Sequence, residues 1–285
     1  MATAGTLKQI WRYPVKSTRG ETVDSTGITS TGIAGDRGWA IRDDSVGEIR
    51  GGRNLPNLLH CSSRYLEEPI TNPLPAPMIT MPDGTEILSD DPDTSRLMSE
   101  LVGKPVSIWP QVSQYNLDHY RRIPMTEEEL IEIFGREPGE PIPEFSSFPK
   151  VVEEFVSPPG TYFDATEIQV LTTSTLAYMK QKNPNADWSV LRFRPNMVID
   201  TGDEPTLIES TWQGKLIKIG DVEMECFGPT PRCAMTMHPQ QEDIEKDPSV
   251  LRTIVKEGNQ NLGAYFHVTN PGIIIQGASV ELLDK

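Results

Sequence analysis

The clearest alternation of hydrophobic and polar positions in the chain lies between residues 217 and 226. Apolar side chains occupy every second position on both sides of a Gly-Asp turn at 220–221, and charged side chains separate them. This period of two predicts a β-hairpin with one face in the core. The strand pattern ends where Pro229 and Pro231 follow, because proline cannot donate to a sheet and restricts the residue before it. We therefore expect a stiff loop that presents Cys233.

Short strand patterns separated by glycine-rich turns dominate the N-terminal half. Strands are expected over 7–13 and 39–42, and a hairpin over 78–88 with a Pro-Asp-Gly turn. One helix interrupts them, capped at residue 93 or 94 and ended by Gly103. These patterns predict an antiparallel, barrel-like N-terminal half.

The segment 116–157 is the least regular part of the chain and is rich in proline and glutamate. It holds one short helical pattern, in which Thr126 and Glu129 form a capping box. Two interpretations stay open, an acidic linker or a loop that lies over a site. The elements expected after it are strands at 168–171, 197–199, 264–268, 273–276 and 280–283, with helices that start at 172–175 and 247–248.

Composition and charge narrow the function classes. The 285 residues fit one large domain or two intimate ones, and no composition break marks a free linker. A formal charge of −15 opposes general attraction to nucleic acid or anionic membranes. Three cysteines cannot all pair, which favours a reducing compartment, and no long apolar segment indicates a signal peptide or membrane anchor. We expect a soluble cytoplasmic protein.

Cys233 is the first candidate for chemistry. Arg232 beside it is expected to favour the thiolate, which binds soft metals or attacks as a nucleophile. The alternative is a buried apolar thiol. Lys16 and Ser17 follow a strand and offer an ammonium and a hydroxyl to a phosphate, although a solvated surface lysine fits the same pattern. Arg37, in a second glycine-rich turn, is either another phosphate contact or the partner of a nearby carboxylate.

Further polar groups lie in the second half. Hydroxyls at the start of the expected helix after residue 171 suit an anion site, or simply helix capping. The arginines and the amide in the motif RFRPN at 192–196 are either structural or ligand-binding, and Asp164 lies in a Phe-Asp-Ala turn.

Five short motifs occur in one order along the chain: YPVKS at 13–17, GDRGW at 35–39, RFRPN at 192–196, PRC at 231–233 and a Pro-Gly to Gly segment at 271–277. In this order they resemble the MOSC superfamily, the molybdenum cofactor sulfurase C-terminal domain proteins, preceded by an N-terminal MOSC β-barrel domain. Among these, the chain looks most similar to the mitochondrial amidoxime-reducing component proteins and their bacterial counterparts.

The resemblance implies a fold and a cofactor. The fold is α+β but mainly β, with a barrel-like N-terminal domain at 1–115 packed intimately against a β-barrel MOSC domain at 116–285 that has a few short helices. The cofactor is molybdenum bound to molybdopterin, with Cys233 as the protein's metal ligand and Asp164 as a proton relay. The implied cofactor-binding residues are Lys16, Ser17, Arg37, Thr172, Thr173, Ser174, Arg194 and Asn196.

The resemblance also implies a reaction, reductive cleavage of the N–O bond in hydroxylamines, amidoximes or N-hydroxylated bases. Because the chain lacks the clustered cysteines of an iron–sulfur domain, electrons are expected from a separate ferredoxin-like or flavin reductase partner. Two alternatives stay open. One is sulfur transfer through a Cys233 persulfide, although the sulfurases that do this carry a pyridoxal-phosphate desulfurase segment that 285 residues cannot hold. The other is a cofactor carrier without turnover.

Overall fold

The molecule is organised around a closed barrel of seven strands. The computed structural model describes residues 2–70, 73–137, 139–143, 151–241 and 243–283. The strand order is β12-β11-β15-β14-β13-β17-β1, and β1 pairs back onto β12; all neighbours are antiparallel except β11 and β12. The barrel strands are β1 (Ala2–Arg12), β11 (Ile168–Thr172), β12 (Met197–Asp200), β13 (Leu216–Ile219), β14 (Val222–Pro231), β15 (Asn261–Asn270) and β17 (Ser279–Leu283).

The alternation at 217–226 forms β13 and β14, as predicted, but the expected end of the strand before the prolines was wrong: β14 continues to Pro231 and pairs with β15 there through irregular register. Ile217 lies opposite Met224 and Ile219 opposite Val222, and all four side chains are fully buried in the barrel interior. Burying a side chain of this size contributes about 1.5–3 kcal/mol, so the period of two in the sequence selects this face for the core.

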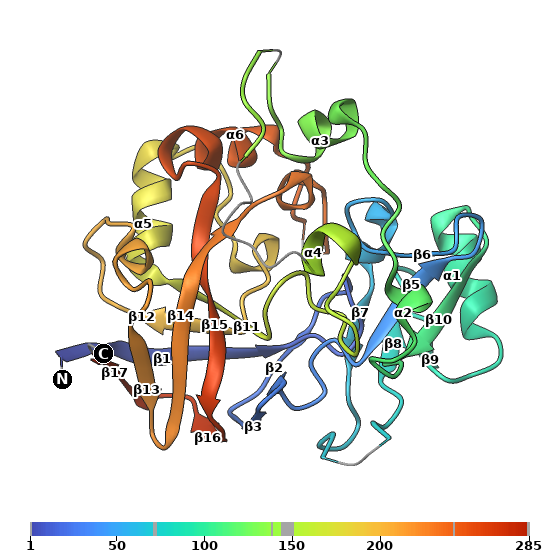
Figure 1. Ribbon diagram of the computed structural model, residues 1–285, viewed down its shortest axis with the longest axis horizontal. Helices are drawn as coiled ribbons and strands as arrows, with labels where there is room; N and C mark the ends of the chain where they lie inside the picture. Colours follow the sequence, from blue (N-terminus) through green and yellow to red (C-terminus); the bar gives the residue numbers. More distant parts are fainter. Residues whose placement is uncertain (1, 71–72, 138, 144–150, 242, 284–285) are drawn as a thin grey trace.

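The first strand belongs to the same barrel as the last. β1 lies between β17 and β12, and its Leu7 and Ile10 join the same core as Phe266 of β15. Figure 1 shows β1 running along the base of the barrel toward the smaller sheets, with both chain ends at one edge. The expected units 1–115 and 116–285 therefore share this strand, and the boundary between them stays a prediction.

The rest of the N-terminal half forms small sheets. The predicted hairpin at 78–88 is confirmed as β8 and β9, which pair through a turn at Gly84. The sheets are β10-β5-β6, β16-β3-β4 and β7-β8-β9, and β2 (Glu21–Thr22) pairs with β1. Their strands are β3 (Ser25–Thr29), β4 (Gly32–Ile33), β5 (Trp39–Asp43), β6 (Glu48–Arg50), β7 (Ser62–Arg64), β8 (Met78–Thr80), β9 (Glu86–Leu88), β10 (Val106–Pro110) and β16 (Gly272–Ile275).

The helices are short and lie outside the strands, which confirms a mainly β, α+β fold (Figure 1). Two predicted helix boundaries hold: Gly103 ends α1 in a left-handed conformation, and Thr126 and Glu129 form the capping box of α3. No helix in the described ranges is long and apolar enough to cross a membrane. The helices are α1 (Thr94–Val102), α2 (Leu117–Tyr120), α3 (Glu127–Ile133), α4 (Val151–Glu154), α5 (Thr173–Lys182) and α6 (Pro248–Glu257).

The described parts of the segment 116–157 pack onto the body. Tyr120 and Phe155 are buried in a hydrophobic cluster with Ala40 and Ile49 of the N-terminal sheets. Farther along, the two carboxylate oxygens of Glu140 accept hydrogen bonds from the Arg252 guanidinium on α6. These contacts hold the segment against both halves of the protein.

Candidate functional site

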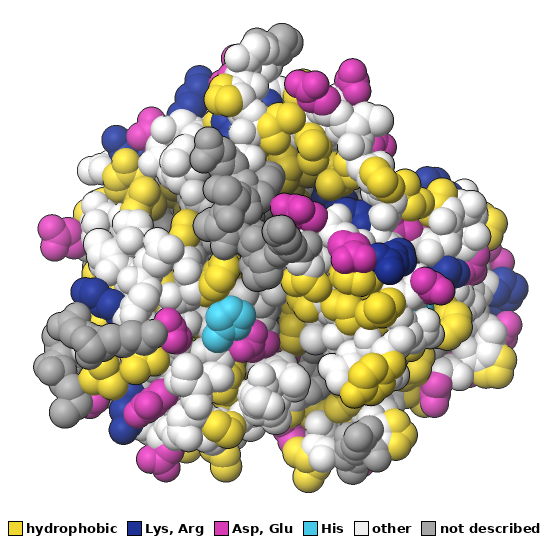
Figure 2. All heavy atoms as spheres, viewed as in Figure 1, with side chains coloured by type: hydrophobic (Ala, Val, Ile, Leu, Met, Phe, Trp, Pro, Cys, Tyr) yellow, Lys and Arg dark blue, Asp and Glu magenta, His cyan; other side chains and the backbone are white. Residues whose placement is uncertain are grey.

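A cleft of about 410 Å³ lies where the first sheets, the segment 122–156 and the loop after β14 meet. Figure 2 shows basic side chains set back in a hollow beneath hydrophobic side chains near α3. A smaller cavity of about 70 Å³ continues from it. Lys16, Ser17, Asp164 and Cys233 line both spaces, so four of the predicted site residues are brought together from three distant parts of the chain.

Cys233 is the cysteine that the cleft exposes. It follows β14 and immediately precedes a 3-10 turn, Ala234–Met237. The other two cysteines are buried in hydrophobic clusters, where desolvation raises their thiol pKa values to about 12. Burial also raises the pKa of Cys233, and the strongest opposing charge is Arg53. The ligand-free side chain is therefore a thiol at neutral pH.

This corrects the role expected for Arg232. Its side chain is buried against the smaller cavity and donates hydrogen bonds to the carbonyl oxygens of Leu262 and Phe193, at 2.6–2.9 Å. It lowers the Cys233 pKa less than Arg53 does, and the net shift is upward. Arg232 and Cys233 are neighbours in the sequence, but the guanidinium is not the main charge acting on the thiol, because an extended backbone points neighbouring side chains in opposite directions.

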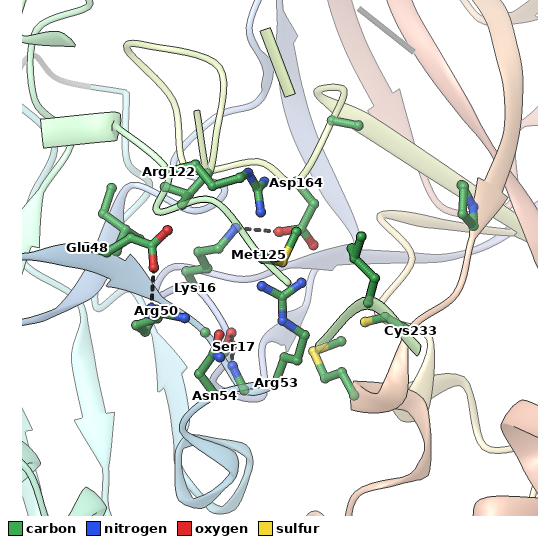
Figure 3. Close-up of a pocket in the computed structure, with 18 of the residues that line it drawn as sticks. Lys16, Ser17, Glu48, Arg50, Arg53, Asn54, Arg122, Met125, Asp164 and Cys233 are labelled. Carbon is green, nitrogen blue, oxygen red and sulfur yellow. Dashed lines mark hydrogen bonds and ion pairs between the residues drawn. The ribbon is translucent and has the colours of Figure 1, made fainter. Parts of the chain in front are cut away.

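Lys16 and Asp164 form an ion pair in the cleft, with Lys16 Nζ 2.6 Å from Asp164 Oδ1 and 2.7 Å from the Tyr162 carbonyl oxygen (Figure 3). Desolvation raises the Asp164 pKa, but this side chain is 75% exposed to the cleft, so the charges of Lys16, Arg37 and Arg53 prevail and hold the pKa below its usual range. Asp164 is a carboxylate, and the proton of the pair resides on Lys16.

Ser17 occupies a left-handed conformation, with φ of 72°. Its Oγ accepts a hydrogen bond from the Gly52 N–H at 2.8 Å, and it is 5% exposed. Gly51 lies against it so closely that a Cβ there would be 2.6 Å from Ser17 Oγ. The Lys16-Ser17 turn is thus fixed by a two-glycine loop that the sequence places 35 residues later.

Arg37 and Arg194 line the smaller cavity, and both guanidinium groups pack over the ring of Tyr13. Their guanidinium carbons lie 4.7 and 4.2 Å from the centroid of Tyr13, and both residues have left-handed backbones. Arg37 pairs with Asp36 and Arg194 Nη1 donates to the Thr18 carbonyl oxygen at 2.7 Å. The buried Nη2 atom of Arg194 has no hydrogen-bond partner among the described residues. Backbone strain of this kind concentrates at ligand sites.

Asn196 lies behind this cavity and does not line it. It is 2% exposed, donates to Asp36 Oδ2 at 2.8 Å and accepts from the Gln169 N–H at 3.1 Å. Through Asp36 it helps to position Arg37.

The three predicted hydroxyl residues at the start of α5 lie outside both cavities. Thr172 caps the helix by accepting a hydrogen bond from the Thr175 N–H, while the hydroxyls of Thr173 and Ser174 donate to the Gly202 carbonyl oxygen. The structure thus gives them the capping and loop-anchoring roles, and a cofactor contact for them stays a prediction.

Three arginines that line the cleft were absent from the sequence-derived site: Arg53, Arg122 and Arg50, the last of which pairs with Glu48. Arg53 carried a signal, since it follows the two glycines that face Ser17. Arg122 carried none, because it lies in the acidic segment 116–157. Figure 3 shows the Arg53 side chain reaching into the middle of the cleft and the Arg122 side chain entering from the opposite wall. They make part of an acidic protein's surface locally cationic.

Residues 4–88 match the family described as "MOSC N-terminal beta barrel domain", and residues 160–281 match "MOSC domain". This is a MOSC protein with both domains. The cleft brings together residues of both matched regions: Lys16, Ser17 and Arg53 come from the first, and Asp164 and Cys233 from the second.

Similar proteins carry related names at low identity. The chain is 25% identical to human "Mitochondrial amidoxime-reducing component 1", with 99% of this chain and 84% of that protein aligned. It is 26% identical to bovine "Mitochondrial amidoxime reducing component 2", with 81% and 66% aligned, so about a third of the bovine protein lies outside the match. A solved structure of the YUAD protein from Bacillus subtilis is 11% identical, with a TM-score of 0.46 over 99% of this chain and 96% of that one.

Proposed function

We propose that this MOSC protein binds molybdenum cofactor through Cys233 and reduces N-hydroxylated compounds with electrons from a separate protein. The observation that carries the proposal is the convergence on one cavity of Cys233 with a lysine, a serine and three arginines that come from both matched regions. The names of the relatives support the reductase assignment.

The residues present fit such a cofactor. A thiol that can deprotonate suits a soft metal, and guanidinium and ammonium donors suit a phosphate. The unpartnered Nη2 atom of Arg194 gives the smaller cavity a donor without an acceptor, and the close approach of Gly51 to Ser17 keeps the backbone open where a side chain would intrude. Lys16, Ser17, Arg37 and Arg194 would hold the pterin and its phosphate, and Cys233 would ligate the metal.

When bound, the cofactor would supply the two-electron redox chemistry. In the proposed reduction an N–O bond breaks, two electrons and two protons enter, and an amidine or amine and water leave. The chain's own part is to hold charge and protons near the reacting bond. Lys16 Nζ carries the available proton and can pass it on, and solvent returns a proton to the amine while Asp164 stays ionised and holds Lys16 in place.

The binding of the metal should itself release a proton. Because burial holds the Cys233 pKa above its ordinary value, the thiol must deprotonate when it ligates the metal. Loading should therefore weaken as the pH falls.

The test is the molybdenum and pterin content of the protein purified from a host that makes the cofactor, with turnover of an aromatic amidoxime driven by a reduced viologen dye. We expect near-stoichiometric molybdenum and amidine formation in the wild type, both lost in Cys233→Ala. Cys61→Ala is the matched control, since it removes a thiol remote from the cleft and should keep both. Pterin and metal without turnover would favour the carrier; neither, in folded protein, would refute the proposal.

A further inference from the structure

The larger part of the cleft, beyond Cys233, holds two arginines, Arg53 and Arg122, that form no ion pair with a carboxylate of the described residues. Arg53 has no hydrogen-bond or ion-pair partner among the described residues, and its Nε is buried. Within the described part of the chain, the Arg122 side chain donates only to the Phe155 carbonyl oxygen, from Nε and Nη2. Both guanidinium groups face the open space of the cleft (Figure 3).

The carboxylates in the same walls already have partners. Glu48 pairs with Arg50 at 2.6 Å and accepts the Ile123 N–H at 2.9 Å, and Asp164 pairs with Lys16. The remaining acidic side chain of the lining, Glu153, is exposed at the rim on α4. The interior of this part of the cleft is therefore left with two positive charges.

Those two charges repel each other. Burial lowers the pKa of Arg122 most, and the next cause is the charge of Arg53. Two desolvated like charges cost free energy unless an anion lies between them, and a guanidinium pair offers the forked donors that carboxylate and phosphate accept.

The segment that supplies Arg122 also lines the cleft with apolar side chains. These are Met125, Leu130, Phe134 and Val156. The space thus suits a ligand with a hydrophobic body and one anionic end, and it opens onto Cys233.

We propose that Arg53 and Arg122 form an anion-binding subsite, so that the preferred substrates are N-hydroxylated compounds that carry a carboxylate or phosphate at the end away from the N–O group. The N–O cleavage at Cys233 rests on the proposed function. The anion-binding subsite is argued from Arg53 and Arg122 alone. They orient the ligand through its anionic end and take no part in the bond cleavage.

The experiment compares two amidoximes of equal size, a benzene ring with the amidoxime para to either a carboxylate or a carboxamide. Calorimetry measures binding of each to the cofactor-loaded protein without any electron donor, and steady-state kinetics then measures kcat/KM with the viologen donor. The variant is Arg122→Gln, which keeps an amide N–H donor but loses the positive charge. The matched control is Arg121→Gln, the neighbouring arginine, which is 48% exposed and pairs with Glu154 outside the cleft.

We expect the carboxylate compound to bind about tenfold more tightly than the carboxamide, the range of a charge-assisted hydrogen bond. Arg122→Gln should remove most of this ratio, and Arg121→Gln should keep it. Raising the salt concentration should reduce the ratio in the wild type.

Three results would overturn the subsite: equal binding of the two compounds by the wild type, an equal loss in both arginine variants, or loss of molybdenum from Arg122→Gln, which would place the arginine with the cofactor. Failure of the reductase proposal looks different. Carboxylate-selective binding that depends on Arg122, without any turnover, would keep the subsite and refute the reaction.

Discussion

Replacing Gly51 by alanine tests whether the two-glycine loop positions the Lys16-Ser17 turn. A Cβ at residue 51 would lie 2.6 Å from Ser17 Oγ, where ordinary contact begins at 3.4 Å. The hydroxyl or the loop must then move by about 0.8 Å to restore contact distance. If the hydroxyl moves directly away from the loop, the 2.8 Å hydrogen bond from the Gly52 N–H lengthens to about 3.6 Å and is lost.

The cost follows from burial. Ser17 is 5% exposed and Gly52 is buried, so water does not readily replace the lost bond. An unsatisfied buried polar group costs about 1–3 kcal/mol. We therefore expect Gly51→Ala to lower the free energy of unfolding by about 2 kcal/mol. A displaced Ser17 and Lys16 should also reduce cofactor retention.

Urea denaturation followed by circular dichroism measures the first effect, and molybdenum content after gel filtration measures the second. Gly27→Ala is the matched control, because nothing lies within 4 Å of the Cβ it would add. The reasoning about the loop fails if Gly51→Ala unfolds at the wild-type urea concentration and retains the wild-type amount of molybdenum.

Two further predictions concern titrating groups. In cofactor-free protein, iodoacetamide should modify Cys233 faster as the pH rises toward 9. Arg53→Gln should slow the modification severalfold at pH 8, because it removes the largest charge that opposes the effect of burial on the Cys233 pKa. Mass spectrometry measures the rates, and equal rates in Arg53→Gln and wild type would contradict this role of Arg53. Burial raises the pKa of Glu209 above its ordinary 4.5, so its favourable contribution to stability is complete below that pH and is lost as the pH rises through the folded-state value. The unfolding free energy of wild type relative to Glu209→Gln should therefore fall between pH 4.5 and 8, and a constant difference would count against it.

The strands and helices with strong local patterns were predictable from the sequence. The alternation at 217–226, the turn at Gly84, the left-handed Gly103 and the capping box at Thr126 all depend on residues within a few positions of one another. What no local pattern contained was the partner of each strand. The pairing of β1 with β12 and β17 joins residues nearly 200 or more positions apart. An alternating strand can bury its apolar face against any apolar surface, so the alternation does not specify which strand lies beside it.

The candidate site divides in the same way. The family resemblance predicted Lys16, Ser17, Asp164 and Cys233 as residues of one site, and all four line the cleft. The charge beside Cys233 was assigned to the wrong arginine, because its neighbour Arg232 is committed to backbone carbonyls.

The sequence by itself determined the family, the mainly β character and the residue types of the proposed cofactor site, since these depend on local pattern and side-chain chemistry. Tertiary structure alone decided which charges share a space. Arg53 and Arg122 come from a glycine loop and from an acidic segment, and only the packing of that segment over the cleft makes them neighbours. Electrostatic effects follow distance through space and burial, and neither is written in the order of residues along the chain.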